Sequence, residues 1–381
     1  MKRISILVLG LCACFMSVAW GQPSAATVRD WRQFHRLDMQ RMNPFENVLN
    51  VHNVGKLGLK WSYDTGVGDF GVAASPAVAN GVVYVGSDVV DDGSVYALDA
   101  STGALLWSYA TGDGVFSSPA VANGVMYVGS FDNNVYALNA KTGAKLWSYT
   151  TGQIVQSSPA VVEGVVYIGS FDNSVYALNA STGALLWSYP TAGYVASSPA
   201  VANGVVYVGS FDNSVYALNA KTGAKLWSYA IAQVFASPAV ANGVVYVGSD
   251  VDDGSVYALD ASTGALLWSY ATGGQVYSSP AVANGVVYVG SDDGKVYALN
   301  AKTGVKLWSY PAGVVFSSPA VANGVVYVGS GDFNVYALNA KTGVKLWSYA
   351  TGGYVMSSPA VVNGVVYVGS GDSKVYAFGL Q

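Results

Sequence analysis

The sequence NAKTGAKLWSY, from Asn139 to Tyr149, recurs letter for letter from Asn219 to Tyr229. Each copy joins a Thr-Gly turn to a tryptophan, and related copies recur along the chain. Eight tryptophans follow at intervals of 46, 40, 40, 40, 41, 40 and 39 residues: Trp61, Trp107, Trp147, Trp187, Trp227, Trp268, Trp308 and Trp347. This period indicates a repeat architecture, and not the two or three separate domains that 381 residues would otherwise suggest.

Each unit contains four short segments that favour β-strands. The segments SPAV, VVYVGS, VYALNA and KLWSY (A to D) are rich in β-branched and aromatic residues and end at turn residues. Asn-Gly joins A to B in seven of the eight units, as a type I′ hairpin requires, and Glu163-Gly164 is the exception. Thr-Gly joins C to D. Units of four strands and about 40 residues are typical of β-propeller blades.

The motifs SPA, VYA and WSY each occur eight times. The chain nevertheless places a lone D segment first, Lys56 to Tyr63, and ends after a C segment, Lys374 to Leu380. We therefore predict an all-β, eight-bladed propeller of four-stranded antiparallel blades over residues 56–381. The N-terminal D strand is expected to complete the last blade and close the ring.

The repeated tryptophan has a structural explanation. A Trp on the outer strand, beside a tight Thr-Gly turn, can lie against the next blade. Burying one such ring removes roughly 150–250 Å² from water, which is worth several kcal/mol at about 25 cal/mol per Å². We expect all eight tryptophans to dock blade against blade.

The stretch VYALNAKTGAKLWSY resembles the tryptophan-docking motif of the PQQ-like (pyrroloquinoline quinone) β-propeller repeats, over residues 56–381. The segment DWRQFHRLDMQRMNPFENVLNVHNVGKLGLKW also looks like the lead-in of secreted bacterial members. The resemblance implies the propeller fold. It leaves activity open, because the family includes quinoprotein alcohol and sugar dehydrogenases as well as non-catalytic scaffolds. One scaffold is the propeller lipoprotein of the outer-membrane β-barrel assembly machinery.

Residues 1–21 are predicted to be a signal peptide, with a positive start, an apolar stretch and small residues before a cut after Gly21. A rival interpretation places a lipid on Cys14. Both cysteines lie in this segment, so no disulfide framework is expected. Residues 22–55 form a leader arm, expected on the propeller edge, where it could also dock a partner. No later stretch is long and apolar enough for a membrane helix, so we predict an exported protein, periplasmic or extracellular.

The resemblance implies a specific set of cofactor residues in the quinoprotein dehydrogenases. These are a vicinal Cys-Cys disulfide, an arginine near the quinone oxygens, and Glu, Asn and Asp around Ca²⁺. Here the propeller has no cysteine, no arginine after Arg41 and only Glu163 as glutamate. We therefore predict no cofactor, and PQQ with calcium only under the dehydrogenase alternative. The only histidines, His35 and His52, precede the blades, which therefore lack histidine for a catalytic triad or a metal site.

Two further motifs are weak. Residues 66–71 match GxGxxG, but a dinucleotide site needs a helix after it, and here a strand is predicted. Asp250, Asp252 and Asp253 are weak calcium candidates. The turn interpretation competes, because Asp-Gly is what a hairpin between B and C requires.

Variation among the units is confined to the D–A and B–C connections, which emerge on one face of the disk. We call this the variable face, and the face of A–B and C–D turns the constant face. The variable face gathers the candidate ligand residues Phe70, Phe116, Gln156, Tyr194, Phe235, Tyr277, Phe316 and Tyr354. Aromatic rings beside neutral amides suit a protein or peptide segment, or a glycan. Loop drift and aromatic packing in the channel are the competing explanation.

The net charge of −4 and the scattered lysines give no nucleic-acid surface. The sequence thus predicts an exported, non-catalytic interaction scaffold that binds through its variable face. Two alternatives remain open. One is a quinoprotein dehydrogenase with a degenerate cofactor site, and the other is a structural or cell-surface protein without a dedicated ligand.

Overall fold

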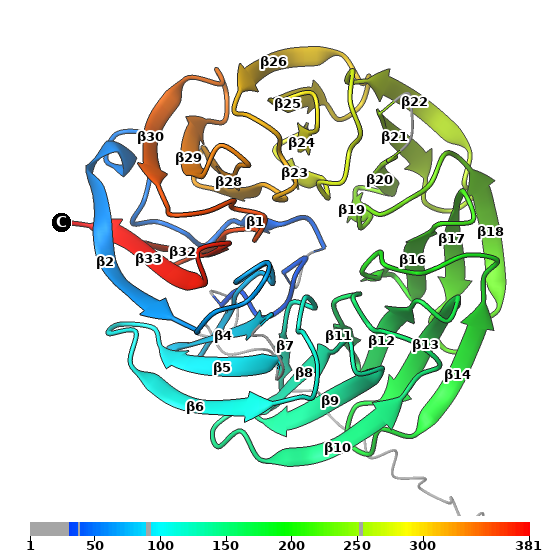
Figure 1. Ribbon diagram of the computed structural model, residues 1–381. Coiled ribbons are helices and arrows are strands. Elements are labelled where there is room, and N and C mark those ends of the chain that lie inside the picture. The colour runs from blue at the N-terminus through cyan, green and yellow to red at the C-terminus, as the bar shows by residue number, and fades with distance from the viewer. Residues whose placement is uncertain (1–29, 37–38, 89–92, 251–253) are drawn as a thin grey trace, which may run out of the picture.

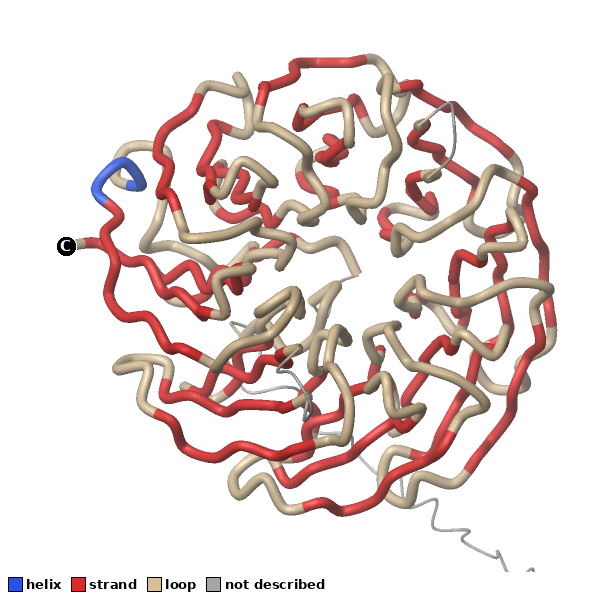
Figure 2. Tube along the Cα trace, viewed as in Figure 1, coloured by secondary structure: helices blue, strands red, loops and turns tan. Residues whose placement is uncertain are grey.

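The computed structural model describes residues 30–36, 39–88, 93–250 and 254–381. Eight sheets, each built on four antiparallel strands, stand side by side in a ring around a central channel (Figure 1). Strands dominate the described chain, and one short 3₁₀ helix, η1 (Val54–Lys56), lies at the periphery (Figure 2). The predicted eight-bladed propeller is confirmed.

Blades 1 to 8 are numbered in chain order, each with strands A to D from the channel outward. The A strands are β3 (Ala77–Ala79), β7 (Ala120–Ala122), β11 (Ala160–Val162), β15 (Ala200–Ala202), β19 (Ala239–Ala241), β23 (Ala281–Ala283), β27 (Ala320–Ala322) and β31 (Ala360–Val362). The B strands are β4 (Val82–Ser87), β8 (Val125–Gly129), β12 (Val165–Ser170), β16 (Val205–Ser210), β20 (Val244–Gly248), β24 (Val286–Ser291), β28 (Val325–Gly329) and β32 (Val365–Ser370). The C strands are β5 (Ser94–Asp99), β9 (Asn134–Asn139), β13 (Ser174–Asn179), β17 (Ser214–Asn219), β21 (Ser255–Asp260), β25 (Lys295–Asn300), β29 (Asn334–Asn339) and β33 (Lys374–Leu380). The D strands are β6 (Leu105–Ala110), β10 (Lys145–Thr150), β14 (Leu185–Pro190), β18 (Lys225–Ala230), β22 (Leu266–Ala271), β26 (Lys306–Pro311), β30 (Lys345–Ala350) and β2 (Leu57–Asp64).

The ring closes as predicted. Blade 8 has the order β2-β33-β32-β31, so the first D strand pairs with the last C strand. Their antiparallel register runs from Leu57 opposite Leu380 to Asp64 opposite Lys374. Both ends of the propeller are therefore held in one sheet.

The hairpin chemistry is also confirmed, with one correction. Asn80 and Gly81 both have positive φ, 52° and 77°, as a type I′ turn requires. Glu163 adopts the same conformation with φ 50°. The A strands begin after the Ser-Pro pair and not on it, because proline has no N–H to donate to a ladder.

All eight repeated tryptophans dock on the following blade. Trp147 donates its indole N–H to the carbonyl oxygen of Ala180, 3.0 Å away. A Cβ on Gly183, in the turn of that next blade, would lie 2.7 Å from the Trp147 ring. The same contact recurs around the ring, and Trp347 bonds to Leu57 in the closing blade, which has no such turn.

The leader lies inside the ring from Trp31 to Gln33 and from Met39 to Asn43, so the prediction that it lies on the propeller edge is wrong for these residues, whereas its end reaches the periphery at η1. Its blue trace lies among the inner strands in Figure 1. Each A strand is the inner edge of its blade, so it exposes main-chain groups that need partners. The amides of Val78, Val121, Val240, Val282 and Val321 donate to leader carbonyls of Trp31, Arg32, Met39, Gln40 and Arg41.

Side chains of the leader contact two further A strands, in blades 3 and 8. Gln33 accepts from the Val161 amide, and Asn43 donates to the Val361 carbonyl. Residues Met42–Asn43 form β1, which adds to β27 in parallel. Blades 1 to 3 and 5 to 8 therefore share one inner segment. Among the described residues, no helix has the length and apolarity needed to cross a membrane.

Candidate functional site: a central funnel on the variable face

The two faces of the disk are built as predicted. The C–D turn of blade 1 bonds to its A–B turn, from the Ala100 amide to the Gly81 carbonyl, at 2.9 Å. At the other end, the Asp88 amide after strand B bonds to the Gly71 carbonyl before strand A, at 3.1 Å. D–A and B–C connections thus share the variable face.

A cavity of about 460 Å³ occupies the channel. Its wall comes from the segments that lead into the A strands, and Phe34 of the leader also lines it. The leader bonds to the A strands beyond the Ser-Pro pairs, toward the constant face. The cavity is therefore a funnel with the leader at its floor, and its volume is within the usual range for a ligand site.

Eight serines, one from each Ser-Pro-Ala motif, form a continuous ring in the funnel wall. We call them the ring serines: Ser75, Ser118, Ser158, Ser198, Ser237, Ser279, Ser318 and Ser358. Each amide donates to the hydroxyl oxygen of the ring serine in the next blade, at 2.8–2.9 Å, and Ser358 returns to Ser75. Because these hydroxyl groups accept, their protons remain free to donate to a ligand.

Besides Phe34, six aromatic rings from the blades line the funnel, and we call these six the collar: Phe70, Phe116, Phe131, Phe235, Tyr277 and Phe316. They form two arcs. In the first, the ring centroids of Phe70 and Phe116 are 5.6 Å apart and those of Phe116 and Phe131 are 4.6 Å apart. In the second, Phe235 lies 5.6 Å from Tyr277, which lies 5.3 Å from Phe316. Phe70 and Phe316 remain 52% and 38% exposed, so they are available for contact.

A buried cation lies at the base of the funnel. Arg41 is fully buried, and its guanidinium lies 4.6 Å from the Phe34 ring centroid and 5.4 Å from that of Trp31. Its N–H groups donate to carbonyl oxygens of Phe34, Ser318, Pro319 and Pro359. Burial lowers the pKa of Arg41 to about 9.

His35 is buried beside this group. Both of its ring nitrogens lack a hydrogen-bond partner. Burial and, as a smaller effect, the nearby charge of Arg41 together lower the pKa of His35 to about 3, although the main chain of Ser198 counteracts them in part. The imidazole is therefore neutral at physiological pH.

Six of the eight predicted ligand residues line the funnel: Phe70, Phe116, Gln156, Phe235, Tyr277 and Phe316. Two do not. Tyr194 stacks on Phe171 with centroids 5.1 Å apart, and Tyr354 lies in a neighbouring surface hollow with Asp332.

Sequence reasoning missed Phe34, Phe131, Met356 and the ring serines as funnel residues. The signal for the serines was present, because one serine precedes the proline in all eight units. No comparable signal marks Phe34, since the leader does not repeat.

The calcium candidates form no cation site in the described chain. Asp250 is 5% exposed and its Oδ1 has no hydrogen-bond partner, whereas Asp252 and Asp253 lie outside the described residues. Within the described ranges, no group of three His, Cys, Asp or Glu side chains is placed to hold a metal ion.

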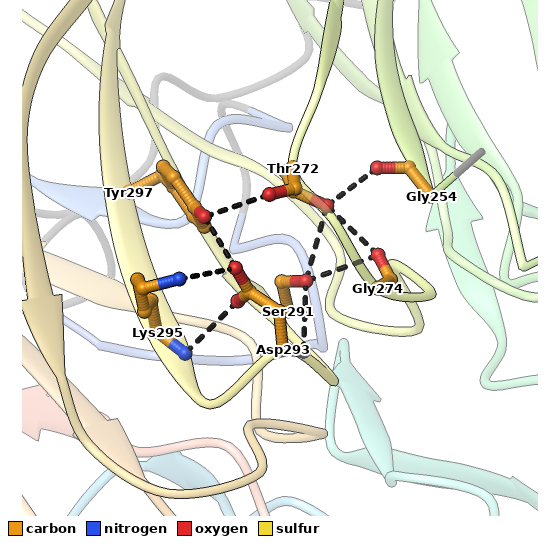
Figure 3. A network of polar contacts seen from close by, with 7 residues as sticks. All are labelled: Gly254, Thr272, Gly274, Ser291, Asp293, Lys295 and Tyr297. Atoms are coloured by element: carbon orange, nitrogen blue, oxygen red, sulfur yellow. Dashed lines mark hydrogen bonds and ion pairs between the residues drawn. The ribbon is translucent and has the colours of Figure 1, made fainter.

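A polar network below the variable face fixes the loops that carry the collar (Figure 3). In blade 6, the Tyr297 hydroxyl donates to Asp293, whose carboxylate also pairs with the Lys295 ammonium at 2.8 Å. The Ser291 hydroxyl reaches the hydroxyl of Thr272, at 3.1 Å. Thr272 in turn donates to Gly274 at 2.8 Å, so B–C and D–A segments are joined. Equivalent Tyr–Asp bonds occur in blades 2, 3, 4, 7 and 8.

Charge is divided between the two faces. The described D–A and B–C connections, with adjoining strand ends, carry twelve aspartates and two lysines, a formal charge of −10: Asp64, Asp69, Asp88, Asp113, Asp132, Asp172, Asp212, Asp250, Asp292, Asp293, Asp332 and Asp372, with Lys295 and Lys374. The A–B and C–D turns, with η1 and adjoining strand residues, carry ten lysines, two aspartates and one glutamate, a formal charge of +7: Lys56, Lys60, Lys141, Lys145, Lys221, Lys225, Lys302, Lys306, Lys341 and Lys345, with Asp99, Asp260 and Glu163. The net charge of −4 conceals this polarity.

Comparisons with known proteins agree with this architecture. A family profile described as the β-propeller of the beta-alanine-activating enzyme matches residues 72–323. Another, described as the outer membrane protein assembly factor BamB, matches residues 312–380. The dehydrogenase subunit of a quinone alcohol dehydrogenase from Gluconobacter oxydans is 41% identical over 81 residues, which is 21% of this chain and 10% of that protein. Across the four curated relatives, the match spans 9–16% of their own length.

Solved structures show the same fold over most of the chain. The quinohemoprotein alcohol dehydrogenase of Comamonas testosteroni gives a TM-score of 0.81 at 19% identity, over 93% of this chain and 81% of that one. BamB from Moraxella catarrhalis gives 0.72 at 21% identity, over 85% of this chain and 99% of that one. At such identities the likeness shows the fold alone.

Proposed function

The chain belongs to the family of the beta-alanine-activating-enzyme β-propeller and has PQQ-like repeats, and we propose that it is an exported, non-catalytic scaffold that binds a partner protein. The observation that carries this proposal is the funnel, whose exposed aromatic collar opens on the face where the blades differ from one another. Exposed aromatic rings around a concavity are a common anchor for a partner side chain. The match of residues 312–380 to the profile of the outer membrane protein assembly factor BamB supports a role in protein assembly.

The lining of the funnel does not fit PQQ. That cofactor carries three carboxylates and therefore needs cationic partners. In the dehydrogenases that this chain resembles, an arginine is the implied partner. No lysine or arginine is among the described residues that line the funnel, and the surrounding face has a formal charge of −10. Four hydrogen bonds from the Arg41 guanidinium go to main-chain carbonyl groups and not into the funnel. The quinoprotein alternative therefore rests on family likeness without a matching cofactor site.

The experiment that tests the proposal is partner capture from the envelope fraction of the producing cells. The Tyr277→Ala plus Phe316→Ala variant removes two adjacent collar rings. We expect it to lose a partner that the wild-type protein retains, by tenfold or more, because a buried aromatic anchor is worth about 2 kcal/mol or more. Its melting temperature should stay nearly unchanged, since Phe316 is 38% exposed.

The matched control is Leu146→Ala plus Leu226→Ala, which removes two side chains that are each 51% exposed on outer strands. It should capture the partner as the wild type does. Equal loss in both variants would contradict a binding face, and a collapse of stability in the collar variant would assign the rings to the core. In parallel, a titration with PQQ and Ca²⁺ followed by dye reduction with alcohols tests the dehydrogenase alternative. Saturable binding with turnover would overturn the scaffold proposal.

A further inference from the structure

The acidic groups of the variable face are gathered beside the collar. At the first arc, the Phe70 amide donates to the Asp88 carboxylate at 3.3 Å. A Cβ added to Gly114, two residues before Phe116, would lie 2.6 Å from Asp88 Oδ1. Burial raises the pKa of Asp88, and the neighbouring charges of Asp69 and Asp113 raise it further. Several carboxylates therefore repel one another behind this arc.

A second acidic group lies at the other arc. The Asp250 amide donates to the Gln233 carbonyl at 2.9 Å, two residues before Phe235, and the Asp292 amide donates to the Gln275 carbonyl at 2.8 Å, two residues before Tyr277. Burial raises the pKa of Tyr277, and the charges of both aspartates add to the effect. Asp250 is 5% exposed, and its unpartnered Oδ1 makes it an acceptor without a donor. Asp88 belongs to blade 1 and Asp250 to blade 5, which are opposite one another in a ring of eight. Negative charge thus flanks the collar from both sides.

From this arrangement, and resting on the proposed scaffold function, we infer that the partner presents a basic peptide segment whose arginine or lysine side chain enters the collar. Aromatic rings attract a cation through their π faces, and the attraction grows where the cation is partly desolvated. The two acidic groups add Coulomb attraction and steer a positive segment to the funnel. No basic side chain among the described lining residues competes for this place.

The depth at which the cation binds follows from Arg41. Its positive charge beneath Phe34 disfavours a second cation at the floor and favours one at the collar. Below the collar, the funnel wall instead offers the ring-serine hydroxyl protons, for which the described chain shows no acceptor. They suit the carbonyl oxygens of the peptide main chain. The funnel therefore combines a cation site at its mouth with neutral donors below.

The test uses three capped peptides of the sequence Gly-Ser-Phe-Xaa-Ser-Gly, where Xaa is arginine, its neutral isostere citrulline, or glutamate. Calorimetric titration of the full-length exported protein should show saturable binding of the arginine peptide. The citrulline peptide should bind about tenfold more weakly, which corresponds to about 1.4 kcal/mol. The affinity of the arginine peptide should also fall as the salt concentration is raised, because the attraction is partly Coulombic.

The Asp88→Asn plus Asp250→Asn variant keeps the side-chain shape and removes one charge from each acidic group. It should lose the preference for arginine over citrulline. Glu163→Gln, on the constant face, is the matched control and should keep that preference. Equal binding of the arginine and citrulline peptides, preference for glutamate, or no saturable binding would overturn the inference. If the collar variant still loses its captured partner in that case, the scaffold function stands and only the ligand chemistry fails.

Discussion

The guanidinium of Arg41 donates a 2.9 Å hydrogen bond to the carbonyl oxygen of Pro319, which lies 278 residues further along the chain. Weaker contacts at 3.4 and 3.3 Å reach the carbonyl groups of Ser318 and Pro359. One leader side chain thus connects blades 7 and 8 at the base of the funnel. The leader acts as an inner hub for a ring that β2 and β33 close on the outside.

Replacement of Arg41 should destabilise the whole propeller. We expect Arg41→Met to lower the free energy of unfolding by about 3 kcal/mol, because several buried carbonyl groups lose their donor. Arg41→Lys keeps the charge but cannot span the same acceptors, so it should cost a similar amount. Urea unfolding measures both. An unchanged midpoint in Arg41→Met would show that the hub carries no stability.

His35 should make stability fall below pH 6.5. Its pKa is about 3 in the folded protein and 6.5 unfolded, so the unfolded chain binds the proton first as pH falls. This depressed pKa destabilises the fold by about 2 kcal/mol between pH 7 and pH 5. Unfolding free energies of His35→Gln should lack that loss. An identical pH dependence in both proteins would contradict the buried, neutral assignment.

Two glycine variants separate the stability contributed by tryptophan docking from the cost of a strained turn. Gly183→Ala places a Cβ 2.7 Å from the Trp147 ring at φ 72°, whereas Gly204→Ala has φ 75° and nothing within 4 Å. Both substitutions carry the strain of a positive φ, about 1 kcal/mol. Only Gly183→Ala should also displace the ring, so it should cost at least about 2 kcal/mol more by thermal or urea unfolding. Equal losses of unfolding free energy in the two variants would contradict the docking contact.

The Asp293 network offers a second matched pair. Asp293→Asn weakens the bond from Tyr297 and the pair with Lys295, and we expect a loss of about 1–2 kcal/mol. Asp292→Asn removes an equal charge with no such tyrosine bond and should be nearly neutral. The carboxylate also helps burial to raise the pKa of Tyr297. Spectrophotometric titration should therefore show that pKa lowered in Asp293→Asn alone, and an unchanged titration would contradict the assigned bond.

Much of this architecture was predictable from the sequence, because the repeat period can be measured directly from recurring motifs. The interval between tryptophans, the Asn-Gly and Thr-Gly turns and the lone first D strand lead to eight blades and a closed ring. The path of the leader was not predictable. Its contacts join main-chain carbonyls to the amides of valines from distant blades, and carbonyl groups carry no sequence signal. Phe34 was missed as a funnel residue because its position depends on this path and the leader does not repeat.

The collar was predictable in part. Aromatic residues in the D–A connections recur at corresponding places, which brought Phe70, Tyr277 and Phe316 together as expected. Phe131 follows a B strand and was not among the predicted ligand residues, yet its ring stacks on that of Phe116 with centroids 4.6 Å apart. The stacking partner of a loop side chain depends on loop shape, which the letters alone do not specify.

We propose above all that a partner protein binds the variable face of the disk, on which the funnel opens. A photo-crosslinking amino acid placed at Phe316 on the variable face, and separately at Val305 on the constant face, tests it in the producing cells. Val305 is 61% exposed, so a lack of reaction there would not result from burial. We expect a discrete crosslinked protein from position 316 and none from position 305. Crosslinks from position 305 alone, or from neither position, would contradict it.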